Sequence, residues 1–226
     1  MTIYGNTIGT TMDPAKITEG SAPAGYGLGG QARVVVNPDD ALKSAFYALA
    51  GESSTNYFPD YANFAYGTML VENRYDTLIK QTFYYNGIVA IRNGTRSKAS
   101  ESVVWSPLEF INPPLVINKE YRTAEKSEGK SVYVKRISVT AENDISVIGD
   151  GTNIYFPHNI SNFGRLVRCN AIMDSAYPLP HISHRNNGSA SIISINNVNS
   201  TNIAVAAVNI SRTKPSFVFD IAYCKA

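Results

Sequence analysis

The amino-acid sequence predicts a mainly β protein, and three observations support this fold class. Only 17% of the residues are charged, so Asn, Ser and Thr carry much of the polar surface, and they suit turns and strand faces better than helices. The chain holds 14 Tyr and 9 Phe, which favour strands. Short apolar runs alternate with turn clusters rich in Gly and Asn, which is typical of an antiparallel sandwich or barrel-like module.

Size and composition bound the number of domains. With 226 residues, of which 44% are hydrophobic, the chain can form one large β domain or two smaller ones. Residues 1–37 are expected to form an irregular arm for docking or assembly, because Pro14, Pro23 and several glycines leave this segment little to bury.

Residues 38–50 predict a helix at the start of the first module. Asp39 or Asp40 can cap its N-terminus, and Gly51 follows as a stop signal. The apolar residues that recur at helical spacing are Leu42, Ala45, Phe46 and Leu49.

The pattern then changes to β. Residues 77–85 and 88–92 are apolar runs joined by Asn86-Gly87, which is the strongest short-range signal for a hairpin. Asn93-Gly94 predicts the next turn. Asn112-Pro113-Pro114 predicts the boundary between two modules, because consecutive prolines break strand ladders and stiffen a linker.

The second half predicts strand after strand, with turn clusters between them and no further helix. The expected strands are residues 131–139, 164–173, 190–195, 202–210 and 217–223.

Charge and hydropathy argue against several classes of protein. The net charge is +2 and no run of Lys or Arg stands out, so no nucleic-acid partner is expected. No stretch of about 18 apolar residues occurs, so no membrane insertion is expected. The first residues lack a basic segment followed by an apolar one, which predicts synthesis in the cytoplasm without a secretory signal. In that compartment Cys169 and Cys224 are expected to be buried thiols, and a disulfide between them stays an open alternative.

Residues 25–30 match G-x-G-x-x-G, the fingerprint of a dinucleotide site. That site needs a strand before the motif and a helix after it. Here Pro23 precedes the motif and the strand-like residues 32–36 follow it. The motif therefore predicts a flexible or tightly packed glycine segment, and no cofactor is expected.

His181 and His184 form H-x-x-H on a predicted loop, with His158 and Asp174 as conceivable further metal ligands. No second ligand pair has a familiar metal-site spacing, so exposed loop histidines are expected and no metal is assigned. One alternative stays open: in a symmetric trimer, one His from each subunit could meet on the axis.

No catalytic residue and no enzyme activity are expected. Ser183 lies near His181 and Asp174, but the G-x-S-x-G turn that presents a nucleophilic serine is absent. Glu125 and Glu128 lie in a charged stretch that is typical of a solvated hairpin end. Paired carboxylates for glycan cleavage could still come from distant strands, so a glycan hydrolase stays an alternative.

Aromatic residues cluster in the first half, at residues 57–61, at Tyr84-Tyr85 and at Trp105. Aromatic faces stack on sugars and anchor interfaces. The alternative, favoured for any single ring, is that these side chains fill a small core or a subunit interface.

A set of motifs in residues 38–110 resembles the small knob-like module of bacteriophage tail fibres and R-type pyocin fibres. The matching features are DDALKSAFYALAG, Pro59, GTMLVE, the Gln-centred IKQTFYY, Arg92 and the Trp in VVWSPLEF. The family pattern usually ends in Trp-x-x-Trp, and Leu108 stands here in place of the second Trp. The resemblance implies a small α+β module over residues 38–112.

The segment EYRTAEKSEGKSVYVKRI, residues 120–137, is similar to the opening of a C-terminal head module common in phage fibre proteins. The chain's end, TKPSFVFDIAYCKA, is similar to the closing strand of that module. These similarities imply an antiparallel β-sandwich head over residues 115–226 that forms a homotrimer.

Together the resemblances imply a virion structural protein. It would be a trimeric phage fibre subunit, of a tail fibre or similar, made in the host cytoplasm and mediating attachment to the host surface. Residues 1–37 would dock on other virion proteins, and a glycan or protein of the host surface would be the outer partner. Two alternatives stay open: a capsid-decorating head fibre without a dedicated receptor, and a virion-associated glycan hydrolase.

The resemblance fixes no receptor-contact residue, so contact surfaces are predicted from the residues alone. The loops around Asn143–Asn153 and Tyr177–Gly188 are long, polar and rich in residues useful for recognition. The candidate receptor-contact residues are Tyr177, His181, His184, Arg185 and Asn186.

Overall fold

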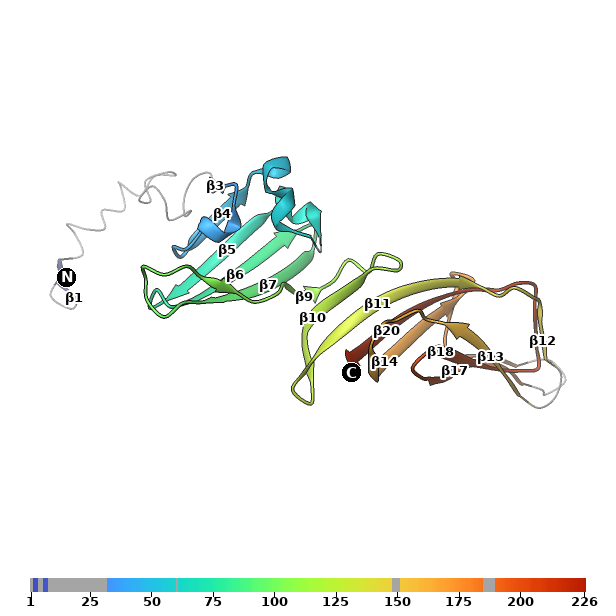
Figure 1. Cartoon of the computed structure of the whole chain (residues 1–226). Coiled ribbons are helices and arrows are strands. Elements are labelled where there is room, and N and C mark those ends of the chain that lie inside the picture. Colours follow the sequence, from blue (N-terminus) through green and yellow to red (C-terminus); the bar gives the residue numbers. More distant parts are fainter. Residues whose placement is uncertain (1, 4–5, 8–31, 60, 148–150, 185–189) are drawn as a thin grey trace. The chain divides into compact units, whose positions relative to one another are not determined.

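The structure is a computed structural model that describes residues 2–3, 6–7, 32–59, 61–147, 151–184 and 190–226 (Figure 1). The protein is mainly β, as the sequence predicts. It divides into two compact units, Met1–Asn112 and Pro113–Ala226. No helix among the described residues is long and apolar enough to cross a membrane. Residues 8–31, which hold the glycine motif and most of the expected arm, lie outside the described residues.

The first unit contains a sheet in the order β9-β7-β6-β5-β4-β3. Neighbouring strands are antiparallel, except for the parallel pair β3 and β4. A short strand, β8, also pairs with β7, and the two-residue strands β1 (Thr2–Ile3) and β2 (Asn6–Thr7) pair with each other. The other strands of the unit are β3 (Arg33–Val35), β4 (Ala45–Leu49), β5 (Thr68–Arg74), β6 (Leu78–Tyr85), β7 (Ile88–Thr95), β8 (Val104–Trp105) and β9 (Glu109–Asn112). β3 therefore gives regular structure to part of the segment predicted as an irregular arm.

The helix predicted over residues 38–50 is wrong. Only Pro38–Asp40 is helical, as a single 3-10 turn (η2). Its cap is Asn37, whose Oδ1 accepts a hydrogen bond from the Asp39 backbone N–H at 2.9 Å. The capping role predicted for Asp39 or Asp40 thus belongs to the residue before the proline.

The apolar residues of the expected helix form strand β4 instead. Ala45, Tyr47 and Leu49 are buried, whereas Phe46 between them is exposed, which is the alternation of a strand. Ladders to β3 and β5 satisfy the backbone of this strand on both sides. Packing and pairing therefore override the helical propensity of an alanine- and leucine-rich segment.

The hairpin predicted at Asn86-Gly87 is confirmed. Tyr85 pairs with Ile88, and both turn residues have the positive φ that a type I′ turn requires, 46° and 75°. The turn predicted at Asn93-Gly94 is wrong, because both residues lie inside β7. Gly94 serves close packing instead: a Cβ atom there would lie 2.7 Å from the ring of Trp105.

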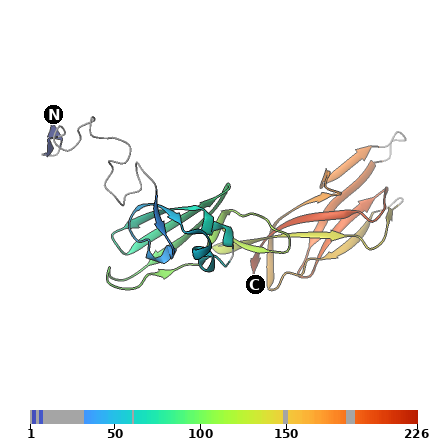
Figure 2. The same cartoon turned by 90° about the horizontal axis from the view of Figure 1, so that it is seen from above.

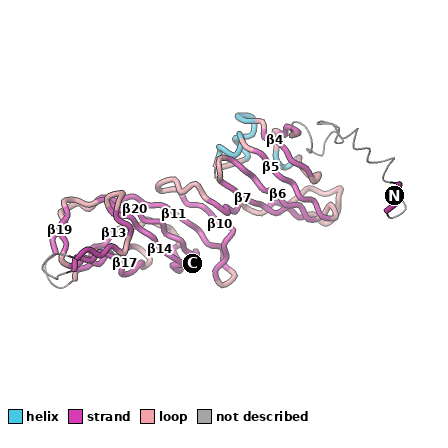
Figure 3. The backbone as a smooth tube through the Cα atoms, turned by 180° about the vertical axis from the view of Figure 1, so that it is seen from behind, coloured by secondary structure: helices cyan, strands magenta, loops and turns pink. Residues whose placement is uncertain are grey.

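Two short 3-10 helices, η3 (Gly51–Tyr57) and η4 (Ala62–Tyr66), complete the first unit and lie beside β4 and β5 (cyan in Figure 3). They bring Phe58 and Phe64 onto the sheet. The Phe58 ring meets Phe83 of β6 edge-on at 5.2 Å, and Phe64 stacks on Phe110 of β9 at 5.9 Å. These four rings are almost fully buried and form the core of the unit.

Gln81 ties the η2 turn to the sheet. Its buried amide donates from Nε2 to the carbonyl oxygens of Pro38 at 2.6 Å and Ala41 at 3.1 Å. Its Oε1 accepts a hydrogen bond from Arg92 Nε at 2.8 Å. Every polar atom of this buried amide is therefore used in holding the segment before β4 against the sheet.

Arg92 extends this network to the turn and to the tryptophan. Its guanidinium donates to Asp39 Oδ1 at 2.5 Å and lies 4.2 Å from the ring centroid of Trp105. Burial lowers the pKa of Arg92, and the charge of Asp39 opposes that effect. Gln81, Arg92 and Trp105, which the sequence motifs single out separately, thus meet in one cluster that we call the Arg92 network.

The second unit is built from two antiparallel sheets and a two-stranded ribbon (yellow to red in Figure 2). The orders are β15-β14-β20-β11-β10, β13-β18-β17-β16 and β12-β19. The strands are β10 (Glu120–Ser127), β11 (Lys130–Thr140), β12 (Ile145–Val147), β13 (Thr152–Pro157), β14 (Phe163–Met173), β15 (Tyr177–Pro178), β16 (His181–His184), β17 (Ala190–Val198), β18 (Asn202–Val208), β19 (Ile210–Arg212) and β20 (Ser216–Lys225).

One hydrophobic core lies between the two sheets of this unit. Phe217 and Phe219 of β20 contact Phe156 of β13, with ring centroids 4.9 and 5.9 Å apart. Ile193 and Ile203, from β17 and β18, belong to the same buried cluster. This arrangement confirms the predicted antiparallel sandwich.

The five strands predicted in the second half are all present. The run over residues 202–210 is divided, however, because Asn209 takes a positive φ of 48° between β18 and β19. β10, β12, β13, β15 and β16 were not predicted, since their sequences are short or mix polar and apolar residues without a long apolar run.

Replacing Arg92 with Met is expected to destabilise the first unit by about 2 kcal/mol, because the buried Gln81 Oε1 loses its donor. Trp105 is the single tryptophan of the chain and lies on Arg92, so its fluorescence reports this unit. Urea unfolding followed by that fluorescence measures the change. Arg74→Met, at an exposed arginine on the same sheet, is the control, and equal midpoints for both variants would contradict the role given to the network.

Candidate functional site

A cleft of about 630 Å³ opens in the second unit between two segments of chain. One wall is the end of β11 with the loop and β12 that follow it, and the other is β13. The lining residues are Val139, Thr140, Ala141, Glu142, Asn143, Asp144, Ile145, Ser146, Val147, Thr152, Ile154, Tyr155, Phe156 and Pro157.

Strand edges form much of both walls. β13 is the outermost strand of its sheet, with β18 as its neighbour. β11 keeps its ladder to β20 up to Thr140, whereas its described pairing with β10 ends at Lys135. An edge strand directs every second N–H and C=O away from its neighbour, so β13 has backbone groups along its outer edge that no strand of its sheet pairs.

The core of the sandwich closes the cleft from beneath. Ile145 and Phe156 line it, and both are buried. Ile145 is held by its pairing with Arg212 in β19, and Phe156 is held by Phe217. The floor is therefore apolar and fixed by packing.

Polar groups lie around this floor. Tyr155 is 59% exposed whereas its neighbour Phe156 is buried, so the two side chains lie on opposite faces of β13 and the Tyr155 ring stands on the outer face of this wall. Glu142, Asn143 and Asp144 are exposed on the loop opposite. Asp144 Oδ1 accepts a hydrogen bond from the Lys214 backbone N–H at 3.2 Å, which anchors this loop to the chain before β20. The cleft thus combines an apolar floor with carboxylates and an amide, and an exposed aromatic ring stands on the outer face of its β13 wall.

The predicted loop Asn143–Asn153 contributes to this cleft, apart from residues 148–150, which lie outside the described residues. Receptor contact by this loop stays a prediction.

The second predicted contact region is only partly described. Tyr177 lies in β15, is 36% exposed and has the Arg212 guanidinium 5.5 Å from its ring centroid. His181 and His184 lie in strand β16, so the expectation of loop histidines is wrong in its secondary structure. Arg185 and Asn186 fall outside the described residues. Tyr177 does not line the cleft, so the two predicted regions do not form one described site.

His158 is excluded as a metal ligand, because both of its ring nitrogens already have hydrogen-bond partners. This ring is 1% exposed, its Nδ1 accepts from the Ile160 N–H at 3.1 Å, and its Nε2 lies 3.0 Å from the Asn199 carbonyl oxygen. Nε2 must carry the proton, since Nδ1 is an acceptor and a carbonyl can only accept. Within the described parts of the chain, no group of three His, Cys, Asp or Glu side chains is placed to hold a metal.

Glu125 and Glu128, the carboxylates considered for glycan cleavage, lie at the end of the β10–β11 hairpin, as predicted. Glu125 accepts a hydrogen bond from Arg168 at 2.6 Å, and Glu128 forms an ion pair with Arg165. Each carboxylate therefore has its own arginine partner, and the four side chains join the hairpin to β14.

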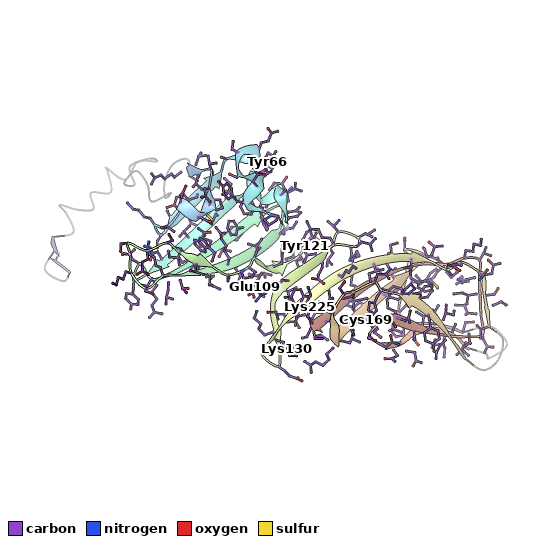
Figure 4. All side chains as sticks on the ribbon, in the orientation of Figure 1. Tyr66, Glu109, Tyr121, Lys130, Cys169 and Lys225 are labelled. Carbon is purple, nitrogen blue, oxygen red and sulfur yellow. The ribbon has the colours of Figure 1, made fainter. Side chains whose placement is uncertain are left out.

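The aromatic clusters of the first unit divide between core and surface. Phe58 fills the core, and Trp105 stacks on Arg92. Tyr57 and Tyr66 are exposed on η3 and η4, and Figure 4 labels Tyr66 at the surface of the unit. The core interpretation is thus right for Phe58.

The two cysteines lie on opposite faces of the β14–β20 ladder. Cys169 is paired with Ile221, so both side chains point into the main core. Cys224 is three residues further along β20 and packs with Val132 and Val134 on the other face. Both are free thiols, so the disulfide alternative is excluded. Burial, with a smaller effect of Asp220, raises the pKa of Cys169 (labelled in Figure 4) to about 12.

Comparisons with known proteins give remote structural similarity only. No protein-family model and no curated protein matches the chain. The P. aeruginosa R1 pyocin fibre (residues 323–701) is 11% identical with a TM-score of 0.25, and the alignment covers 85% of this chain and 66% of that one. An N-truncated R2-type pyocin tail fibre is 10% identical with a TM-score of 0.25, and coverage is 84% and 94%.

The P. aeruginosa R2 pyocin fibre, also as a C-terminal fragment, is 11% identical with a TM-score of 0.26. This chain spans 66% of the R1 fragment and 65% of the R2 fragment. TM-scores of this size leave a shared overall fold unestablished.

Cys169 is expected to react very slowly with iodoacetamide at pH 8, because a thiol with a pKa of about 12 is almost wholly protonated there. In a Cys224→Ser variant, alkylation followed by mass spectrometry should be more than about a hundredfold slower than that of a cysteine peptide. Unfolding in urea should restore the peptide rate. A rate near that of the peptide in the folded protein would contradict the burial of this thiol.

Proposed function

We propose that the chain is a non-enzymatic phage fibre subunit that forms a homotrimer and attaches the particle to the host surface through the cleft in its second unit. The observation that carries the attachment role is the cleft itself. It places polar side chains over an apolar floor, and the exposed Tyr155 ring stands on the outer face of its β13 wall. Binding sites for small ligands typically have a volume of roughly 300–1,000 Å³ and this mixed lining.

The Arg92 network supports the fibre assignment. The resemblance to the knob-like module rests partly on Gln81, Arg92 and Trp105, which are distant in sequence. In the structure these residues contact one another, directly or through Arg92, and hold the η2 turn that begins the same motif. Residues that match a family pattern and also cooperate physically support the resemblance more strongly than isolated matches.

The placement of acidic residues supports binding rather than cleavage. Glycoside hydrolases need two carboxyl groups on either side of the scissile bond. In the cleft, Glu142 and Asp144 belong to one loop, and the described residues of the β13 wall supply no carboxylate. Glu125 and Glu128 are each bound to an arginine. This distribution fits a surface that holds a ligand without cutting it.

The place of the chain in the particle follows from the same proposal. It would be made in the host cytoplasm and built into the virion, with residues 1–37 docking on other virion proteins. The partner of the cleft is then a component of the host surface, and the hydroxyl groups of a glycan suit its carboxylates and amide.

Tyr155→Ala is expected to reduce adsorption of the purified protein to host bacteria roughly fivefold, since loss of an exposed aromatic contact beside the cleft costs about 1 kcal/mol of binding. Adsorption of fluorescently labelled protein across a panel of strains measures this. Tyr75→Ala is the matched control, because Tyr75 is 78% exposed in the first unit.

Immunogold labelling of intact particles tests the virion assignment alongside. Label on the tail supports a tail fibre, and label on the capsid supports the head-fibre alternative. Wild-type adsorption by a correctly folded Tyr155→Ala variant would remove the β13 wall from the proposed contact surface.

A further inference from the structure

The sheet of the first unit packs on only one of its two faces within that unit. η3 and η4 cover the packed face, where Phe58 and Phe64 both meet Phe83 of β6. Strand alternation turns the next residue, Tyr84, to the opposite face, which we call the outer face. Tyr84 is 38% exposed there, and Phe46 of β4 is 40% exposed. The outer face thus leaves large side chains in contact with solvent.

Two cross-strand rows on the outer face are almost wholly apolar. The register of the ladders places in one row Phe46, Leu70, Thr82 and Ile91, and in the next row Val34, Ala48, Thr68, Tyr84 and Val89. We call them the apolar rows. With strands about 4.8 Å apart and residues of one face about 7 Å apart along a strand, two rows over five strands cover roughly 300 Å². An uncovered apolar patch of this extent is typical of an interaction surface.

The charges beside the apolar rows are balanced. The next row along the strands contains Glu72 and Lys80, which are register partners and form an ion pair at 2.9 Å. Glu109, paired with the end of the first row, and Arg74, at the end of β5, add one charge of each sign at the rim. In a cyclic oligomer, copies of a surface near the axis face one another, so an unbalanced charge would meet its own kind. This face can therefore meet its own copy without charge repulsion.

The large sheet of the second unit also has an outer face, but that face carries ion pairs. β20 sends Phe219 into the core and Asp220 to this face, where Asp220 accepts two hydrogen bonds of 2.6 Å from Arg136. Arg168, on the same face of β14, binds Glu125 at 2.6 Å. Covering these groups would remove water from charged side chains, which costs free energy. Of the two outer faces, the one in the first unit is therefore better suited to contact between copies.

Resting on the proposed homotrimer, we propose that the apolar rows of three copies pack together about the trimer axis, so that the outer face of the first unit is the interface between subunits. A hollow of about 360 Å³ beside Phe46 and Leu70 can receive an apolar side chain of a neighbouring copy, such as Val34, which is 65% exposed. A standard interface buries about 800 Å² on each partner. The apolar rows form the centre of such an interface, and the polar residues around them form its rim.

Phe46→Lys tests this interface, and Ile172→Lys is its matched control. Ile172 is 44% exposed on the outer face of the second unit, close to the 40% of Phe46. Multi-angle light scattering over a dilution series gives the mass of each variant. We expect wild type and Ile172→Lys to have three times the 24.6 kDa chain mass. Phe46→Lys should dissociate at concentrations at least about a hundredfold higher, because three like charges would meet in an apolar contact.

Trp105 fluorescence shows whether each variant is folded, and Val34→Lys, on the edge strand β3, replaces Phe46→Lys if that variant unfolds. A trimer that survives these substitutions, or that Ile172→Lys weakens equally, would overturn the interface and leave the homotrimer standing. Reduced adsorption of a trimeric Phe46→Lys variant to host bacteria would then assign the face to a host component. A monomeric wild-type protein would overturn the proposed fibre subunit and the interface together.

Discussion

The row of buried side chains on β20 is the constraint on which the second unit depends. Phe217, Phe219, Ile221 and Tyr223 are fully buried on one face of this strand, while Ala222 and Cys224 are buried on the other. β20 is also bonded along its length to both β11 and β14. A strand that is paired on both sides and buried on both faces cannot shift its register without exposing apolar surface, so it fixes its neighbours.

The cleft follows from that constraint and from the edges that remain beyond it. Because β20 holds β11 up to Thr140, the chain leaves β11 at a set position, and Asp144 is then tied to the segment that enters β20. Phe156 packs on Phe217 and places β13 opposite. The floor of the cleft is thus positioned by a rigid core, and Tyr155 stands on the face of β13 opposite to that core.

The sequence predicted elements whose signals are local, and it failed where packing between distant segments decides. The hairpin at Asn86-Gly87 and strand β20 were predictable, because turn chemistry and alternation lie within the element. Residues 38–50 fit a helical spacing and a strand alternation equally well, and only the neighbouring strands choose between them. Asn93-Gly94 was predicted as a turn because turns favour glycine. The structure instead requires a glycine at position 94 because the Trp105 ring packs against it, and the sequence does not show that the two residues are neighbours. The loop at Asn143–Asn153 was identified from its polarity, but the β13 wall of the cleft depends on the packing of the sandwich.

The proposed fibre subunit is expected to form a homotrimer. Multi-angle light scattering of the purified protein during size-exclusion chromatography measures this oligomeric state. We expect a particle of three times the 24.6 kDa chain mass that persists on dilution. A stable monomer of 24.6 kDa over the same concentration range would contradict the assignment as a fibre subunit.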